Sequence, residues 1–149
     1  YDTPANIFVA TFMGSPAMNV VTAKVEVENG RPMAKVALHD GKIASLPFSQ
    51  DNLLAWDGRD IMLGIRPETI TDEDASDRKS RNIAPMMNRI VVTEPAGSDT
   101  FVTMTLGGRD VIARMRSDAN GRAGEDFQFA VNMEKAVAFD PETEDRIAP

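Results

Sequence analysis

Short stretches in which apolar and polar residues alternate recur along the chain and predict β-strands. The first covers residues 20–27, where valine and alanine alternate with threonine, lysine and glutamate. Asn29-Gly30 follows it, a pair typical of the tight turn in a β-hairpin. Further strands are predicted at 33–38, 42–48, 60–65, 88–94, 100–106, 110–116, 126–131 and 136–139, separated by turn residues. Strands this short and this regularly spaced are typical of a small barrel or sandwich.

A helical periodicity precedes the strands. Over residues 5–13, phenylalanine, valine and methionine fall on one face of a predicted helix, and the Gly-Ser-Pro sequence at 14–16 ends it. A helical turn is also predicted at 50–56. The polar stretch at 72–82 has nothing to bury and is predicted to be an exposed loop.

Composition narrows the classes of partner. The chain has 149 residues, with 16 basic and 23 acidic side chains and a net charge of −7. Nucleic acids and anionic membranes attract concentrated positive charge, so neither is an expected partner.

The absence of cysteine excludes disulfides and thiolate chemistry. No apolar run approaches the ~20 residues that cross a bilayer, so we expect a soluble protein, and the start at Tyr1 suggests a piece of a longer one.

The sequence offers no constellation for catalysis. His39 is the only histidine and is interpreted as a residue at a strand end. The acidic residues at 72–77 lack the spacing of a calcium loop and are interpreted as a solvated loop. No phosphate-binding G-x-x-x-x-G-K-[ST] loop is present. We therefore expect no enzyme activity, cofactor or metal in this chain.

Five short motifs, in order along the chain, carry a family resemblance. They read YDTPANIFVA at 1–10, FMGSPAMN at 12–19, LGIRPE at 63–68, EPAGSDT at 94–100, and FD at 139–140 with RI at 146–147. Together they resemble the segment after the ATPase domain in ATP-binding subunits of carbohydrate-importing ABC transporters, such as the maltose and sn-glycerol-3-phosphate importers. Two positions depart from the pattern: Met13 stands where isoleucine is usual, and Glu144-Asp145 replaces the glycine expected after Thr143.

The resemblance implies a fold and a division of the chain. The fold is mainly β, an OB-like small barrel of short antiparallel strands (a transport-associated OB, or TOBE-type, domain) with a short amino-terminal helix. Residues 1–19 would be the helix and linker that leave the ATPase domain. Residues 20–149 would be the regulatory domain, with two sub-lobes joined near 69–87 as the alternative to one lobe. ATP and magnesium are expected only in the ATPase domain.

The resemblance also implies a function. The domain would hold two ATPase subunits together and receive regulatory signals. Its partners would be a second copy of itself, its own ATPase domain, through that domain the membrane subunits of the transporter, and a regulatory protein. The expected location is the cytoplasm, peripheral to the inner membrane. The alternative is a free-standing module that binds a small anion or a sugar, with Ser98 and Thr100 as donors, although the acidic charge opposes an anion.

Candidate contact residues come from these motifs and from the methionines. Methionine suits adaptable interfaces but more often fills gaps in a core. The motif at 66–68 is interpreted mainly as a structural turn, and Trp56 as either a core residue or an exposed anchor. The candidates for interface or interdomain contacts are Ser15, Pro16, Met18, Asn19, Arg66, Pro67, Glu68, Met86, Met87, Gly97, Ser98 and Asp99.

Overall fold

The chain folds almost entirely as short strands, as the alternating pattern predicts. The computed structural model describes residues 4–7, 17–73 and 82–147. In these ranges the elements are β1 (Asn19–Glu28), β2 (Arg31–Ala37), β3 (Ile43–Pro47), the 3-10 helix η1 (Asp51–Trp56), β4 (Asp60–Ile65), the 3-10 helix η2 (Pro67–Thr69), β5 (Ile70–Asp72), β6 (Ile83–Arg89), β7 (Val92–Ala96), β8 (Asp99–Leu106), β9 (Arg109–Arg116), β10 (Asp126–Asn132) and β11 (Val137–Phe139).

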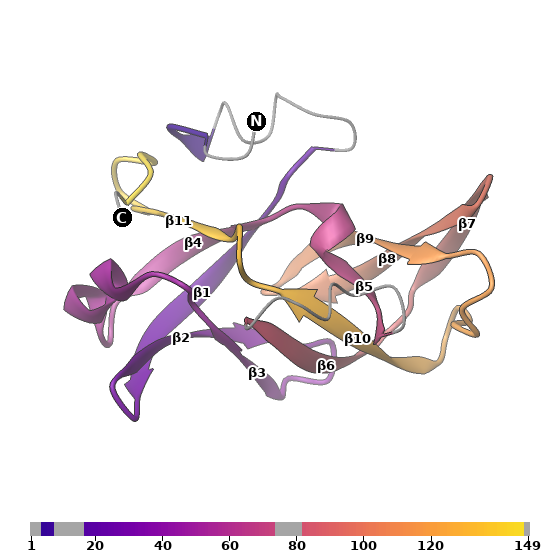
Figure 1. The fold of residues 1–149 in the computed structure, drawn as a ribbon, viewed down its shortest axis with the longest axis horizontal. Helices are drawn as coiled ribbons and strands as arrows, with labels where there is room; N and C mark the ends of the chain where they lie inside the picture. The colour runs from indigo at the N-terminus through magenta and orange to yellow at the C-terminus, as the bar shows by residue number, and fades with distance from the viewer. Residues whose placement is uncertain (1–3, 8–16, 74–81, 148–149) are drawn as a thin grey trace.

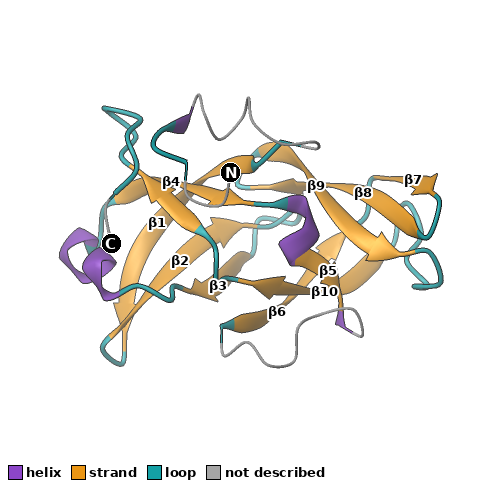
Figure 2. Ribbon diagram, turned by 45° about the horizontal axis from the view of Figure 1, so that its top comes forward, coloured by secondary structure: helices purple, strands orange, loops and turns teal. Residues whose placement is uncertain are grey.

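The strands form three antiparallel sheets (Figures 1 and 2). One is five-stranded, in the order β11-β4-β1-β2-β3, and the others have the orders β5-β10-β6 and β7-β8-β9. The mainly β fold is confirmed, but the closed barrel is wrong, because these three backbone ladders are separate among the described residues. The β7-β8-β9 sheet projects towards the right of Figure 1, away from the β1–β2 turn.

The predicted amino-terminal helix receives no support. Its first residues, Ala5 and Asn6, lie in a bend and in an isolated antiparallel bridge to Asp145. Ile7 is the one described residue of this stretch that is helical, and the remainder of the predicted helix, residues 8–13, lies outside the described residues.

Two stretches of the chain differ from the sequence prediction. The single strand predicted at 88–94 is two strands, because the buried Ile90 separates β6 from β7 and the chain passes there from one sheet to another. The exposed loop was predicted to begin at Asp72. This start is too early, because Asp72 is the last residue of β5 and is only 4% exposed. The turn at Asn29-Gly30 is confirmed, with φ of 52° and 77°, the positive values that a type I′ hairpin needs.

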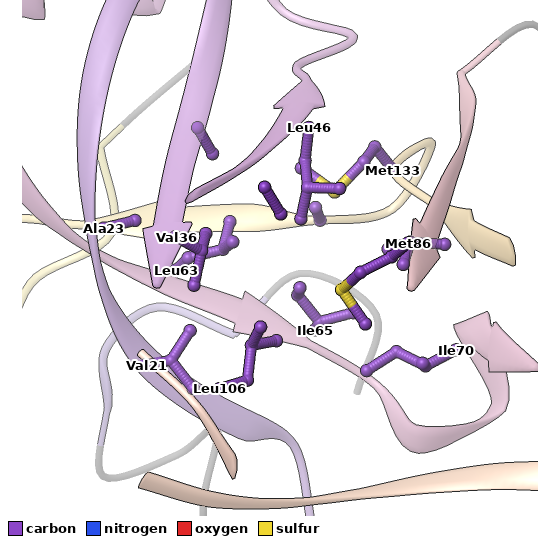
Figure 3. Close-up of a cluster of buried hydrophobic side chains, with 14 of the residues drawn as sticks. Val21, Ala23, Val36, Leu46, Leu63, Ile65, Ile70, Met86, Leu106 and Met133 are labelled. Carbon is purple, nitrogen blue, oxygen red and sulfur yellow. The ribbon is translucent and has the colours of Figure 1, made fainter. Parts of the chain in front are cut away.

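One hydrophobic core joins the three sheets. Val21 and Leu63 of the five-stranded sheet, Met86 of β6 and Leu106 of β8 all point into it (Figure 3). In β1, β6 and β8 buried positions alternate with more exposed ones, so one face of each of these strands supplies the core. Because every sheet has a face in the same core, none can fold by itself without exposing that face.

A buried asparagine links the three sheets. Asn88 of β6 donates from Nδ2 to the carbonyl oxygen of Thr105 in β8, 3.0 Å away. Its Oδ1 accepts from the amide of His39, just after β2, at 3.1 Å. His39 therefore has the structural place at a strand end that the sequence predicts, and its main chain rather than its imidazole makes the contact.

A smaller group of side chains, which we call the second cluster, covers part of the other face of the five-stranded sheet, over β1, β4 and β11. It consists of Met18, Val20, Val137 and Phe139, with Ile7 and Met62 packed against them. Gly64 lies beneath it. A Cβ at Gly64 would meet the Met18 sulfur at 2.6 Å and Val137 Cγ2 at 2.9 Å, so the glycine of the LGIRPE motif is required for this packing.

The turn between β8 and β9 packs against the backbone of the five-stranded sheet. Gly107 has a φ of 59°, and a Cβ there would lie 2.7 Å from the carbonyl oxygen of Thr22. The Gly107 amide donates to the carbonyl of Ala37 at 2.8 Å. The two sheets can therefore approach this closely only when residue 107 has no side chain.

We expect alanine at 107 and at 108 to have unequal effects on stability. Gly108 also has a positive φ of 76°, but a Cβ there meets nothing within 4 Å. Gly108→Ala should cost about 1 kcal/mol of left-handed strain, whereas Gly107→Ala adds a clash with backbone and should cost about 3 kcal/mol. Urea denaturation measures both, and equal losses would contradict the close approach of the two sheets.

Candidate interaction surface

Side chains, not a backbone ladder, close the outer edge of β9. Asn19 of β1 donates from Nδ2 to the carbonyl oxygen of Ile112 at 2.8 Å, and its Oδ1 accepts from the Ile112 amide at 2.9 Å. Four residues along, the Arg116 amide donates to Asp72 Oδ1 of β5 at 3.0 Å. The side chains of β1 and β5 thus take positions that a neighbouring strand would occupy in a closed barrel.

Asp72 holds both the main chain and the side chain of Arg116. Besides the amide contact, Arg116 Nε lies 3.1 Å from Asp72 Oδ2, and only 6% of the Asp72 side chain is exposed. Burial of the Asp72 carboxyl raises its pKa, while hydrogen bonds from the Arg116 amide and guanidinium, and the positive charge of that guanidinium, lower it by more. The pKa of Asp72 therefore lies below the ordinary aspartate value.

The Asp72 contact should make stability depend on pH. The pKa of Asp72 is lower in the folded chain than in the unfolded chain. Ionised Asp72 therefore stabilises the fold at pH values above the unfolded pKa, and this stabilisation is lost as the pH falls through the folded pKa. We expect Asp72→Asn to lower the free energy of unfolding by about 1–3 kcal/mol at pH 7. The difference from the wild type should shrink below about pH 4.

The matched control is an exposed ion pair of similar geometry. Arg89 Nε lies 3.1 Å from Asp126 Oδ1, and the two side chains are 43% and 55% exposed. Asp126→Asn should cost less than about 0.5 kcal/mol, because solvent screens the pair. If both substitutions reduced the stability equally in urea denaturation, Asp72 would have no special role in closing the fold.

The β7-β8-β9 sheet presents a partly apolar face to solvent. Strand pairing places Val92, Thr103 and Ile112 in one row across the sheet, and Glu94, Phe101 and Arg114 in the next. Val92 is 52% exposed and Ile112 37%, while the opposite face of β8 and β9 lies in the core and β7 has no buried residue. We call these two rows the outer face.

The predicted contact residues of the EPAGSDT motif adjoin the outer face. Gly97 and Ser98 form the exposed turn between β7 and β8. Asp99 begins β8, and its Oδ2 lies 3.8 Å from Nε of Arg114 in the outer face. The turn and the outer face thus form one continuous surface.

Other predicted contact residues make contacts within the fold. Met18 is buried in the second cluster, and Asn19 is bonded to β9. In the LGIRPE motif, Arg66 and Pro67 are buried, and the amide and hydroxyl of Thr69 both donate to the Arg66 carbonyl, at 3.0 and 2.7 Å. This is the structural turn that the sequence predicts, and it packs against β9.

The remaining predicted contact residues differ in how far they are exposed. Met86 is 2% exposed and belongs to the core, while its neighbour Met87 points the other way and is 49% exposed. Glu68 is half-buried after Pro67. Ser15 and Pro16 lie outside the described residues.

Trp56 is half-buried at the margin of the core. It packs against the main core, and the Arg59 guanidinium lies 4.0 Å from its ring centroid. A cavity of about 350 Å³ beside it is lined mainly by charged side chains, among them Asp60 and Asp140. In the part of the chain that the structure describes, no three histidine or acidic side chains come close enough together to hold a metal ion.

Sequence reasoning missed the outer face, although one signal points to it. In β9 the outward positions carry Asp110, Ile112, Arg114 and Arg116, so an isoleucine stands among charged residues. An apolar side chain on the solvent side of an amphipathic strand indicates a surface that another element covers. The partners of Ile112 across the sheet depend on strand register, which the sequence did not provide.

A comparison with protein-family models finds a match in the first half of the chain. Residues 14–70 match the family model described as the MalK OB fold domain. This stretch of the chain therefore resembles that OB domain.

Its relatives are ATP-binding subunits of ABC transporters. An uncharacterized ABC transporter ATP-binding protein, y4oS, of Sinorhizobium fredii is 38% identical over 99% of this chain and 36% of its own length. The sn-glycerol-3-phosphate import protein UgpC of Chromobacterium violaceum is 34% identical over 99% and 36%. The oligosaccharides import protein MsmX of Bacillus subtilis is 32% identical over 99% and 39%. The chain thus spans little more than a third of the length of these relatives.

A solved structure agrees on the fold. The cytoplasmic molybdate-binding protein ModG, with molybdate bound, superposes with a TM-score of 0.54 over 83% of this chain and 96% of its own, at 14% identity. That identity supports a shared fold and nothing further. Among the residues described here, no helix has the length and hydrophobicity needed to span a membrane.

Proposed function

We propose that this MalK-type domain is the regulatory and dimerisation domain of an ABC sugar importer's ATP-binding subunit, and that it pairs with a second copy through the outer face. The observation that carries the pairing is one row of side chains. Glu94 and Arg114 lie at its two ends, with Phe101 between them. Opposite charges on either side of an aromatic centre make this surface complementary to itself.

A two-fold axis parallel to the strands would bring two copies of this surface together with opposite charges facing each other. If the outer faces of two copies stack on each other across this axis, the two-fold rotation places β7 of one copy opposite β9 of the other. Glu94 then faces the partner's Arg114, and Phe101 faces the partner's Phe101. Two-fold interfaces use one patch twice, and apolar centres with a charged rim are their usual composition. The exposed Val92 and Ile112 extend the apolar centre by a second row.

The proposed function is to keep two ATP-binding subunits together through their paired domains. The import proteins that this chain resembles are named as ATP-binding proteins, and the chain covers only part of their length. We propose that ATP hydrolysis belongs to the remainder of the longer protein, at the cytoplasmic face of the inner membrane. The paired domains would keep two such subunits together and offer a surface to membrane subunits and regulatory proteins.

Charge reversal tests the pairing. In sedimentation velocity, the wild-type chain should show a concentration-dependent dimer. Arg114→Glu should raise the dissociation constant about tenfold or more, because the outer faces then oppose like charges. The double variant Glu94→Arg with Arg114→Glu should recover much of the affinity.

A control separates pairing from folding. Arg122→Glu changes the same charge at an exposed position outside the outer face and should leave the dimer unchanged. The melting temperature of each variant shows whether it is folded. A wild-type chain that remains monomeric at high concentration, or a dimer insensitive to Arg114→Glu, would overturn this interface.

The alternative of a free-standing binding module has its own measurement. Calorimetric titration of the chain with molybdate, sulfate or maltose should give no binding heat if the chain is a pairing domain only. Tight binding of any of these ligands would favour the alternative.

A further inference from the structure

The carboxy-terminal turn is hydrogen-bonded to the amino-terminal end of the described chain. The Ile7 amide donates to the carbonyl of Glu144 at 3.1 Å, and the Arg146 amide donates to the carbonyl of Ala5 at 2.8 Å. Asn6 and Asp145 form an antiparallel bridge between these contacts. Residues 5–7 are thus held by the main chain of 144–146, although nearly the whole sequence separates them.

The same turn is tied to the five-stranded sheet on its other side. The Ile147 amide donates to the carbonyl of Ala138 in β11 at 2.8 Å, and Phe139 makes an isolated bridge to Arg146. The turn therefore lies between β11 and residues 5–7, bonded to both. We call residues 140–147 the latch.

Ile7, whose amide is bonded to the latch, also places its side chain on the second cluster. Ile7 packs against the group formed by Met18, Val20, Val137 and Phe139. Gly64 beneath this group allows the side chains to sit close to the sheet. Main-chain bonds from the latch and apolar contact from the cluster thus fix the same residue.

Side chains within the latch stabilise its turn. Asp140 Oδ1 accepts from the Glu142 amide at 2.8 Å, and Thr143 Oγ1 accepts from the Asp145 amide at 3.2 Å. Glu144 has a φ of 64°, in the left-handed region that favours glycine. A non-glycine residue in this region is strained, so Glu144 strains the latch.

We propose that the latch is the docking site for residues 5–7 and that residue 144 sets how firmly these residues are held. A latch that fixes residues 5–7 also fixes the direction in which any preceding domain is joined to the OB domain. The last point rests on the proposed function, since it needs an ATPase domain upstream. The docking itself depends only on contacts within this chain.

Amide hydrogen exchange at Ile7, followed by NMR on the whole 149-residue chain, tests the docking. Glu144→Gly removes the left-handed strain and should slow exchange at Ile7 about two- to fivefold. Asp140→Ala combined with Thr143→Ala removes both side-chain bonds of the turn and should speed it at least about fivefold. Amides of β8 should change little in either variant.

Glu142→Gly is the matched control. It makes the same chemical change in the same turn, at an exposed residue outside the positive-φ region, so it should not slow exchange at Ile7. Equal effects at 142 and 144, or Ile7 exchange that no latch variant alters, would overturn the proposal. Measurement at concentrations where the chain is monomeric keeps this result independent of the pairing of outer faces.

Discussion

The fold depends on how the outer edge of β9 is satisfied. A buried backbone amide or carbonyl without a hydrogen bond costs free energy, so each sheet edge that meets the core needs a partner. Here Asn19 supplies both a donor and an acceptor to Ile112, and Asp72 supplies acceptors to Arg116. These two side chains join β9 to the other sheets at points where no backbone ladder exists.

Closure by side chains places tight demands on the surrounding packing. An asparagine or aspartate reaches only a short distance, so the sheets must approach closely where it acts. Gly107 allows that approach at the β8–β9 turn, and Gly64 allows it beneath the second cluster. Asn88 then bonds across the remaining junction. Small residues and short polar side chains therefore control the geometry that the apolar core stabilises.

The sequence predicted the local structure well and the long-range contacts poorly. The strand positions, the Asn29-Gly30 turn and the structural role of residues 66–67 follow from periodicity and turn chemistry, which act between near neighbours. Asp72 was misread as solvated because its partner Arg116 is distant in sequence. The hydrogen bonds of Asn19 to Ile112 were missed for the same reason. The outer face depends on the register of three strands, which no local pattern specifies.

The two side chains on β9 also have a consequence for how the chain behaves at high concentration. The strand is eight residues long, and its buried positions carry valine, alanine and methionine, a pattern that in an open edge invites addition of a foreign strand. A foreign strand would have to displace Asn19 and Asp72 from the amides they already hold. Two polar residues that complete the architecture thereby also protect this edge against the addition of a foreign strand.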